Sequence, residues 1–424
     1  MSSGLNIFLN KKILIYGLGK SGLATFNFLK KKSEIFLYDD YKKNFKNLKN
    51  YKNLKKTKFD FIIISPGIDI NKCQLSNFLK KNSKKIYTDL DIFFSFFNND
   101  CITVTGTNGK STTCQLLYEI LSQQNYHVKL VGNIGNPILS LNKIKPKTIF
   151  IVEASSYQLE YSRIFKSKFA MILNISPDHI ERHKTIKRYV SAKFKLLKNQ
   201  SKQSLCFVKK DDSLIKKGLK NTKIKSKIIK VDTNKYQKLF DYKKNEYFLT
   251  EANKENLLFV LAITKKFKLN KQILFNTIQK FKGLKYRQQI VYKDTNLTII
   301  NDSKSTSFSS TIELLKSYPN IYWIVGGKFK KGDKFYLNKK YCKNIKAYIY
   351  GKNKYFFKKN LNNKIQLIKN TSFIDLECLI NHSSLLISCH GSVSHGTRPG
   401  LRRAAGGSGC APADSPRCHL YPVE

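Results

Sequence analysis

The sequence lacks any apolar run that approaches the roughly 20 consecutive residues needed to cross a bilayer. Its N-terminus lacks the succession of basic, apolar and small residues that is typical of a secretory signal. Its nine cysteines form no CxxC pair and no cluster with histidine at zinc-ligand spacing. We therefore expect a cytoplasmic protein with reduced thiols and no membrane insertion.

Acidic residues are scarce, because 28 Asp and Glu face 78 Lys and Arg, which gives a net charge of +50. Such an excess suits nucleic-acid binding. However, 70 of the 78 basic residues are lysines, and they are scattered beside Asn, Ile, Phe and Tyr rather than massed in one segment. A drift toward A/T-rich codons and a functional basic surface both remain open, and we expect no specific nucleic-acid partner.

Lysine is itself absent after Lys369. The last 34 residues, 391–424, instead hold four of the eight arginines, four of the nine prolines and six of the 21 glycines. They show neither helical nor strand periodicity, which predicts a disordered tail. A frameshift, a chimeric join or a cloning remnant would explain the change of composition, and a native tail is the alternative.

With 424 residues, of which 41% are hydrophobic, the chain is long enough for two or three domains. Near its start, the apolar run 12–16 leads into the glycine-rich GLGKSG and then a helical pattern. A second apolar run, 35–38, ends at Asp39, where a Rossmann unit places its ribose-binding acid. This pattern fits NAD, FAD or any ligand with a pyrophosphate and a ribose, or a tight turn without a ligand.

A third strand, expected at 59–64, runs into SPGI, which begins at Ser65. A turn at the carboxyl end of a strand is where such sheets contact ligands.

A second glycine-rich segment, TGTNGKST, follows the apolar run 102–104 and precedes a helical pattern. Gly106 and Gly109 let backbone N–H groups surround a phosphate, Lys110 can bridge the outer phosphates, and the Ser111 hydroxyl suits Mg²⁺. Only two residues separate the glycines, whereas the general phosphate-loop motif has four. The strand before and the helix after it still predict ATP or GTP binding.

Three further residues follow buried elements. Glu153 ends the expected strand 148–152, where a carboxylate can bind Mg²⁺ or orient a nucleophile. His179 lies just beyond the expected strand 171–175, and a lone histidine is either a packing residue or a functional one. Lys193 lies on the apolar stripe of the expected helix 189–197, as a snorkelling side chain or a functional amine.

Taken in order, GLGKSG, SPGI, VTGTNGKST, EASSYQLE, LNISPDHIERH, YVSAKFKL and INDSKSTS resemble the Mur ligase superfamily, from about Lys12 to Ser388. The last motif is the most similar to its D-glutamate-adding members. The resemblance implies an α/β fold of three domains, with a Rossmann-like domain at 1–95, a phosphate-loop ATPase domain with a mostly parallel sheet at 96–282, and an incomplete Rossmann-like domain at 283–390. The tail 391–424 lies outside the resemblance.

The resemblance also implies a site for each ligand, in a monomeric enzyme. UDP-N-acetylmuramoyl-L-alanine would contact Gly17, Gly19, Lys20, Ser21, Asp39, Ser65, Gly67 and Asn133. ATP would contact Gly106, Thr107, Asn108, Gly109, Lys110, Ser111, Thr112, Asn253, Asn256, Arg287 and Asp302. D-Glutamate and the transferring phosphate would lie near Lys304, Thr306 and Lys330. Two Mg²⁺ ions would be held by Ser111 and Glu153, and by His179 with Lys193, whose amine would be carbamylated.

The implied reaction activates the alanyl carboxylate as an acyl phosphate, which the amine of D-glutamate then attacks. The chain departs from its relatives at Lys285 and Tyr286, where they have proline and histidine, and at Ala252, where they have histidine. After Ser388 it reads CHGSVSHGTRPG in place of the segment that closes the D-glutamate pocket. Another Mur-type ligase, such as a folylpolyglutamate synthase, a truncated pseudoenzyme, and a lysine-rich NTPase that binds nucleic acid remain alternatives.

Overall fold

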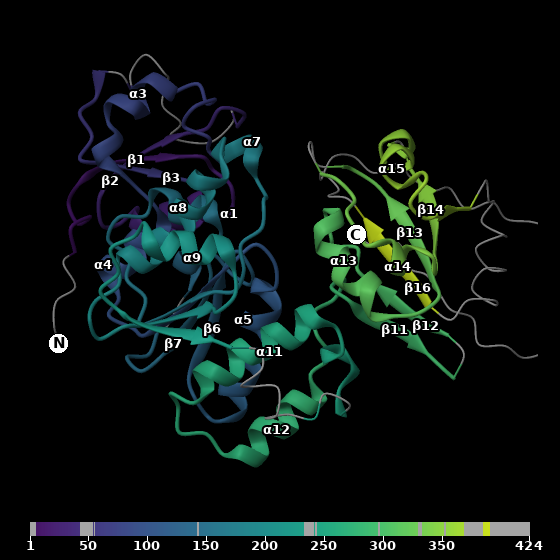
Figure 1. Cartoon of the computed structure of the whole chain (residues 1–424). Helices are drawn as coiled ribbons and strands as arrows, with labels where there is room; N and C mark the ends of the chain where they lie inside the picture. The colour runs from purple at the N-terminus through teal and green to yellow at the C-terminus, as the bar shows by residue number, and fades with distance from the viewer. Residues whose placement is uncertain are drawn as a thin grey trace, which may run out of the picture. The chain divides into compact units, whose positions relative to one another are not determined.

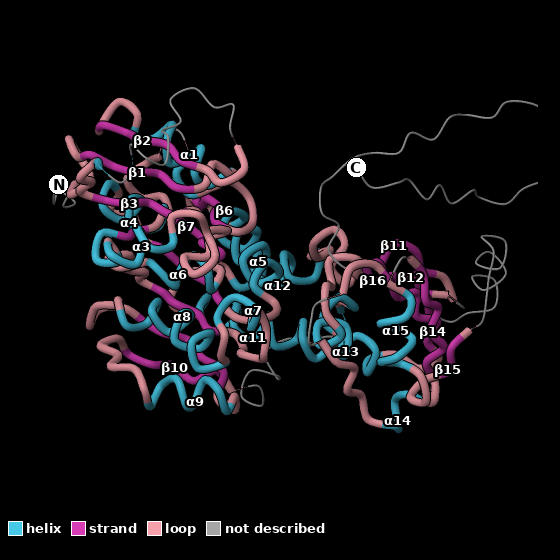
Figure 2. Tube along the Cα trace, turned by 90° about the horizontal axis from the view of Figure 1, so that it is seen from above, coloured by secondary structure: helices cyan, strands magenta, loops and turns pink. Residues whose placement is uncertain are grey.

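The structure is a computed structural model that describes residues 6–42, 54, 56–141, 144–232, 241, 244–295, 297–329, 333–351 and 353–368, and the backbone of 385–390. Lys330 and the tail 391–424 lie outside the described residues. Within the described ranges the strands form three separate sheets, each packed against helices (Figures 1 and 2).

The first sheet is parallel and has the order β2-β1-β3-β4. Its strands are β1 (Lys12–Tyr16), β2 (Glu34–Tyr38), β3 (Phe61–Ile64) and β4 (Ile86–Tyr87). Its helices are α1 (Lys20–Leu29), α3 (Ser76–Lys81) and α4 (Asp89–Phe96), with a 3-10 turn at Ser83–Lys85. The turn from β1 to α1 needs glycine, because a Cβ on Gly22 would lie 1.9 Å from the Gly17 carbonyl oxygen.

The central sheet is also parallel, with the order β10-β9-β8-β5-β7-β6. Its strands are β5 (Cys101–Thr105), β6 (Val128–Gly132), β7 (Ile149–Glu153), β8 (Phe169–Ile172), β9 (Leu205–Lys209) and β10 (Lys227–Val231). Its helices are α5 (Lys110–Gln123), α6 (Ser156–Tyr161), α7 (Ile180–His183), α8 (Ile186–Lys198), α9 (Ser213–Lys220), α11 (Glu251–Thr264) and α12 (Lys271–Lys280), with 3-10 turns at Ile138–Ser140 and Glu246–Phe248.

Alternation along β7 shows that both faces of this sheet are buried. Ile149 and Ile151 belong to the core under α5 and α11, whereas Phe150 and Val152 belong to the core shared with the first sheet. Successive strand residues point to opposite faces, so an unbroken apolar run is required here.

The third sheet has the order β11-β12-β16-β13-β14-β15 and is parallel except for the β11–β12 pair. Its strands are β11 (Gln289–Lys293), β12 (Thr298–Asn301), β13 (Ile321–Gly326), β14 (Ile345–Tyr350), β15 (Gln366–Leu367) and β16 (Leu385–His390). Its helices are α13 (Phe308–Ser317), α14 (Lys339–Cys342) and α15 (Lys354–Leu361). Its core packs Phe308 edge-on against Trp323.

The predicted α/β class with mostly parallel sheets is confirmed, but several element boundaries were wrong, including the start of β3, which is at Phe61 rather than residue 59. β8 ends at Ile172 rather than Ile175, so His179 follows the strand by a longer loop. Helix α8 begins at Ile186, three residues early, because Thr185 caps it by accepting a hydrogen bond from the Arg188 N–H. Strand β16 continues to His390, two residues past the predicted end.

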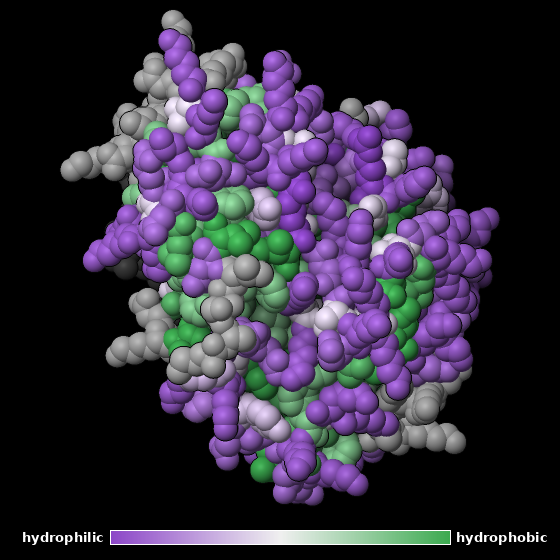
Figure 3. Space-filling view, turned by 90° about the vertical axis from the view of Figure 1, so that its left-hand side faces the viewer, coloured by the Kyte–Doolittle hydropathy of each residue, from purple (hydrophilic) through white to green (hydrophobic). Residues whose placement is uncertain are grey.

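The surface agrees with the scattered lysines. Hydrophilic residues cover most of the face in Figure 3, and apolar areas are interspersed among them. Among the helices in the described ranges, none is both long enough and apolar enough to span a membrane.

A buried carboxylate joins the first and central sheets. Asp91, on α4, is fully buried. Its Oδ1 accepts hydrogen bonds from the backbone N–H groups of residues 163–165 at 2.8–3.0 Å, in the segment after α6. Its Oδ2 accepts the Thr88 N–H at 3.0 Å and so caps its own helix. One side chain therefore satisfies donors from two domains.

Replacing Asp91 tests how much its carboxylate stabilises the fold. Asp91→Ala leaves several buried N–H groups without an acceptor, and we expect a loss of about 3–5 kcal/mol in the free energy of unfolding. Asp100→Ala, which removes the half-exposed ion pair with Lys168, is the control and should cost less than about 1 kcal/mol. Urea unfolding of both variants measures the difference. Equal losses would contradict a special role for Asp91.

Candidate active site

The phosphate loop between β5 and α5 requires its glycines for two reasons. Gly106 and Gly109 have φ values of +155° and +82°, which side chains with a Cβ rarely adopt. A Cβ on Gly109 would also lie 2.0 Å from Oδ1 of Asn256, on α11. Helix α11 therefore packs directly against the loop.

Asn174 fixes the backbone of this loop. Its carbonyl oxygen accepts the Thr107 N–H at 2.9 Å, and its side-chain oxygen accepts the Asn108 N–H at 2.9 Å. Its amide donates to the Asn108 carbonyl at 3.3 Å. Sequence reasoning missed Asn174, although it follows β8, which neighbours β5 in the sheet. The signal was a polar residue just after a buried strand.

Two lysines converge on the Gly106 carbonyl. Lys110 Nζ donates to it at 2.9 Å and Lys193 Nζ at 2.7 Å. Burial lowers the pKa of Lys110. Burial, together with the neighbouring Lys110 charge, lowers the pKa of Lys193 well below its usual value. The loop thus concentrates positive charge where a phosphate would approach the N-terminus of α5.

Glu153 stands beside these lysines at the end of β7. It is 1% exposed; its Oε2 accepts the Ser111 hydroxyl at 2.7 Å, and its Oε1 accepts the Asn133 amide at 2.8 Å. A hydroxyl and a carboxylate oxygen at the start of α5 are the hard ligands that Mg²⁺ takes, so this pair fits the metal. In the part of the chain that is described, no group of three or more His, Cys, Asp or Glu residues could hold a metal.

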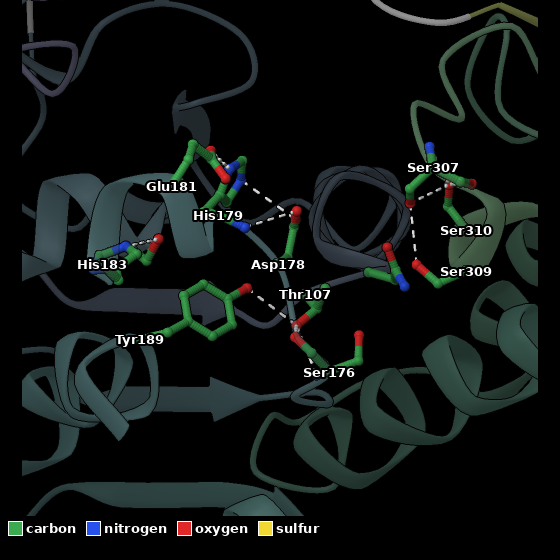
Figure 4. Close-up of polar contacts among 12 residues, drawn as sticks. Thr107, Ser176, Asp178, His179, Glu181, His183, Tyr189, Ser307, Ser309 and Ser310 are labelled. Carbon is green, nitrogen blue, oxygen red and sulfur yellow. Dashed lines mark hydrogen bonds and ion pairs between the residues drawn. The ribbon is translucent and has the colours of Figure 1, made fainter. Parts of the chain in front are cut away.

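His179 begins α7 in the left-handed region, with φ of +54°. Its Nε2 lies 3.4 Å from Asp178 and its Nδ1 lies 3.6 Å from Glu181 (Figure 4). The rings of Tyr157 and Tyr189 lie against it, with centroids at 4.9 Å and 6.4 Å. The Tyr189 ring also faces Lys193 Nζ at 4.6 Å, so it lies next to both residues that sequence reasoning paired at a second metal.

A second histidine, His183, was not singled out from the sequence. It is buried, its Nε2 lies 3.0 Å from the Ser156 hydroxyl, and its Nδ1 lies 3.8 Å from Glu160. Burial and the nearby Arg182 charge lower the pKa of His183 to about 4. The ring is therefore neutral near pH 7, and it links the start of α6 to α7.

The predicted nucleotide asparagines lie on α11 and are buried. Asn253 donates to the Gln288 side chain at 2.9 Å, and Asn256 donates to Asn253 at 3.4 Å. The Gln288 N–H donates to Asp302 at 3.1 Å. Burial raises the pKa of Asp302 to about 7. Arg287 is half-buried beside them. Thr112, on α5, contacts the Tyr247 hydroxyl at 3.3 Å.

At the carboxyl edge of the first sheet, Asp39 shapes the glycine turn. Its Oδ2 accepts the Leu18 N–H at 2.6 Å, and its Oδ1 accepts two further backbone N–H groups at 3.0 Å. Burial raises the pKa of Asp39, but these donors and the Lys42 charge outweigh burial and lower it. The Ser65 hydroxyl donates to the Gly17 carbonyl at 2.6 Å. The other predicted substrate residues of this domain are exposed or half-buried: Gly19, Lys20, Ser21 and Gly67.

In the third sheet's domain, Lys304 is exposed and its N–H donates to the Tyr286 carbonyl at 3.0 Å. Thr306 lines a small pocket with Lys328 and Asp333. The structure thus gathers the phosphate-loop residues with Asn133, Glu153 and Lys193.

Comparison with known proteins gives a consistent picture. The family described as Mur ligase middle domain matches residues 104–276. The UDP-N-acetylmuramoylalanine–D-glutamate ligase of Rickettsia prowazekii is 31% identical, covering 86% of this chain and 87% of that protein. The ligase of the same name from Buchnera aphidicola (Schizaphis graminum) is 34% identical, covering 81% and 83%.

Solved structures support the fold. The UDP-N-acetylmuramate-alanine ligase of Thermotoga maritima aligns with a TM-score of 0.52 at 16% identity, covering 91% of this chain and 96% of that one. The MurF ligase of the same organism, solved in complex with ADP, aligns with a TM-score of 0.52 at 13% identity, covering 90% and 91%. At these identities the likeness shows a common fold.

The buried His183 predicts a pH-dependent stability. Between pH 6.5 and about 4, His183 binds a proton in the unfolded state but not in the native state. The free energy of unfolding therefore falls as the pH falls through this window. This contribution is at most about 3 kcal/mol. His183→Gln should remove that part of the slope, whereas His127→Gln, at an exposed position, should not. Denaturant titrations at several pH values measure it, and an unchanged slope in His183→Gln would refute the assignment.

Proposed function

The chain belongs to the family of UDP-N-acetylmuramoylalanine–D-glutamate ligases, and from this premise we propose that it joins D-glutamate to UDP-N-acetylmuramoyl-L-alanine at the expense of ATP. The observation that carries the proposal is the convergence of Lys110 and Lys193 on the Gly106 carbonyl beside the Ser111–Glu153 pair. The Lys110 cation and hard oxygen ligands at a helix N-terminus suit phosphoryl transfer.

The chemistry needs such an arrangement. A carboxylate is a poor acyl donor, so the alanyl carboxylate attacks the terminal phosphate of ATP, which gives an acyl phosphate and ADP. The amine of D-glutamate then attacks the acyl carbon, forming the amide and releasing phosphate. Both steps move negative charge over the phosphoryl oxygens, and Lys110 lies where its ammonium stabilises that charge. The N–H groups of the first turn of α5 point the same way.

Magnesium is the metal that this site fits, since Ser111 and Glu153 offer it oxygen ligands. When bound, it neutralises phosphate charge and orients the transferring group. Asn133 holds the second oxygen of Glu153, which fixes the rotamer of the carboxylate. His179, with Lys193 beyond the Tyr189 ring, would contribute to a second Mg²⁺ site.

Lys193 fits such a site only after modification, because an ammonium group repels a metal ion. Its pKa is lowered well below the usual value by burial and by Lys110, which favours the neutral amine. The lone pair of a neutral amine attacks the carbon of CO₂, and loss of the N–H proton leaves a carbamate with two oxygen ligands. We propose that Lys193 is carbamylated in this way.

The remaining assignments follow the three sheets. We propose that 1–95 binds the UDP moiety at the glycine turn and Asp39, that 96–282 binds ATP, and that 283–390 binds D-glutamate near Lys304 and Thr306. Asn253, Asn256, Arg287 and Asp302 would contact the nucleotide. A cytoplasmic monomer without a specific nucleic-acid partner completes the proposal. Lys330 and residues 391–424 lie outside the described residues.

The decisive experiment measures release of ADP and phosphate with each substrate omitted in turn. We expect turnover only when UDP-N-acetylmuramoyl-L-alanine is present, and amide product only with D-glutamate as well. Lys110→Ala should lower kcat by at least about a hundredfold, on the scale of a lost electrostatic catalyst. Lys129→Ala, at an exposed position on β6, is the matched control. ATP hydrolysis at the same rate without substrate would refute the proposal.

Carbamylation of Lys193 has its own test. Lys193→Ala should lower activity at least about a hundredfold, and short carboxylates such as formate or acetate should restore part of it as oxygen ligands. Lys198→Ala, exposed at the end of the same helix, should keep activity and show no response to carboxylates. In the protein without substitutions, ¹³C-labelled bicarbonate should give a carbamate signal that is absent from Lys193→Ala. A missing signal would show an unmodified amine.

A further inference from the structure

Tyr189 contacts Thr107 of the phosphate loop and both residues of the proposed second metal site, Lys193 and His179. It lies in the first turns of α8 and is 1% exposed. Its hydroxyl lies 3.1 Å from Thr107 Oγ1, its ring faces Lys193 Nζ at 4.6 Å, and its ring centroid is 6.4 Å from that of His179. Figure 4 shows the hydroxyl directed at Thr107 and away from His183.

The other partners of Thr107 Oγ1 determine which hydroxyl donates in its contact with Tyr189. Thr107 Oγ1 lies 3.2 Å from the Ser176 carbonyl oxygen, which can only accept, so the threonine proton points there. The same oxygen accepts the Ser176 N–H at 3.0 Å. The Tyr189 hydroxyl must therefore donate to the remaining lone pair of Thr107. With one donor and two acceptor sites filled, the Thr107 hydroxyl has no capacity left for a phosphate.

Thr107 is thus an anchor of the loop rather than a ligand. Its N–H donates to the Asn174 carbonyl at 2.9 Å, and its carbonyl accepts Lys110 Nζ at 2.8 Å. Its polar groups are all engaged within the protein. The family resemblance implies a nucleotide contact for Thr107, whereas its hydrogen bonds tie the loop to the segment after β8 and to α8.

We propose that Tyr189 is a positioning residue that sets the distance between Lys193 and the phosphate loop. The hydroxyl holds the loop at Thr107, and the ring, one turn before Lys193 on the same helix, limits where the Lys193 side chain can lie. Because Lys193 Nζ bonds the Gly106 carbonyl, the residue next to Thr107, the loop and the helix meet at two adjacent points. A shift of about 1 Å in such a constellation costs around a hundredfold in rate.

The kinetic part of the test rests on the proposed function. A second, structural part needs no ligase activity. Tyr189→Phe removes the hydroxyl and keeps the ring. Tyr126→Phe, which removes the hydroxyl that donates to the Lys268 carbonyl in the same domain, is the matched control. In the structural arm, amide hydrogen exchange by mass spectrometry should be at least about tenfold faster over 105–109 in Tyr189→Phe and unchanged there in Tyr126→Phe.

In the kinetic arm, Tyr189→Phe should lower kcat at least about tenfold while the Kd for ADP changes by less than about threefold. Adding Tyr189→Phe to Lys193→Ala should cost less than about twofold more, because the hydroxyl acts through Lys193. Fully additive losses, or a weaker Kd for ADP with unchanged kcat, would overturn the inference.

The arms also separate this inference from the proposed function. If the chain without substitutions shows no ligase turnover, the proposed function is refuted. The role of Tyr189 is then tested by hydrogen exchange alone. Normal turnover with unchanged exchange and kcat in Tyr189→Phe refutes the positioning role alone.

Discussion

Two buried lysine amino groups that share one carbonyl oxygen are the constraint around which the central domain is arranged. Lys110 and Lys193 both donate to Gly106, and burial penalises the charged form of each. The carboxylates of Glu153 and Asp178 favour the charged forms of both lysines. Their effect is smaller than that of desolvation, so the pKa of each lysine is still lowered. Lys110 therefore offers an incoming triphosphate a cation that is already dehydrated and fixed, whereas the lowered pKa of Lys193 favours the neutral amine that the proposed carbamylation uses.

The sheet explains how groups so far apart in sequence reach this point. In the order β8-β5-β7, the carboxyl ends of three parallel strands lie side by side, and each is followed by polar residues. β5 delivers the loop, β7 delivers Glu153, and β8 leads to Asn174. The polar edge is tolerable because, apart from the buried Thr103 of β5, the remainder of these strands is apolar on both faces, so most of the sheet's stability comes from residues that do not act on ligands.

Sequence patterns that act over a few positions were enough to predict the local features of the fold. The strand, glycine turn and helix at both nucleotide-type units could be predicted, because apolar runs, glycines and capping residues act over a few positions. Glu153 was found because a carboxylate at the end of a buried strand is conspicuous.

Lys193 could be placed on an apolar face, but its partner could not, since the Gly106 carbonyl is 87 positions away. Asn174, Tyr189 and Asp91 were missed for the same reason: each has an ordinary local setting, and only the assembled fold brings their partners close. The boundary errors at β8 and α8 arose where an apolar run continues beyond the hydrogen-bonded ladder or where a cap precedes the pattern.

The position of β16 has a consequence for how the chain is made. This strand is the last in sequence among those described, yet it lies between β12 and β13 and bonds to both. During synthesis, β12 and β13 leave the ribosome well before the strand that separates them, and for that interval each presents an open backbone edge. The two could pair with each other in a wrong order, or with another nascent chain, whereas the first two sheets are completed by strands close behind them. Quality control by chaperones would accordingly concentrate on the last domain, which becomes a single sheet only once residues 385–390 have emerged.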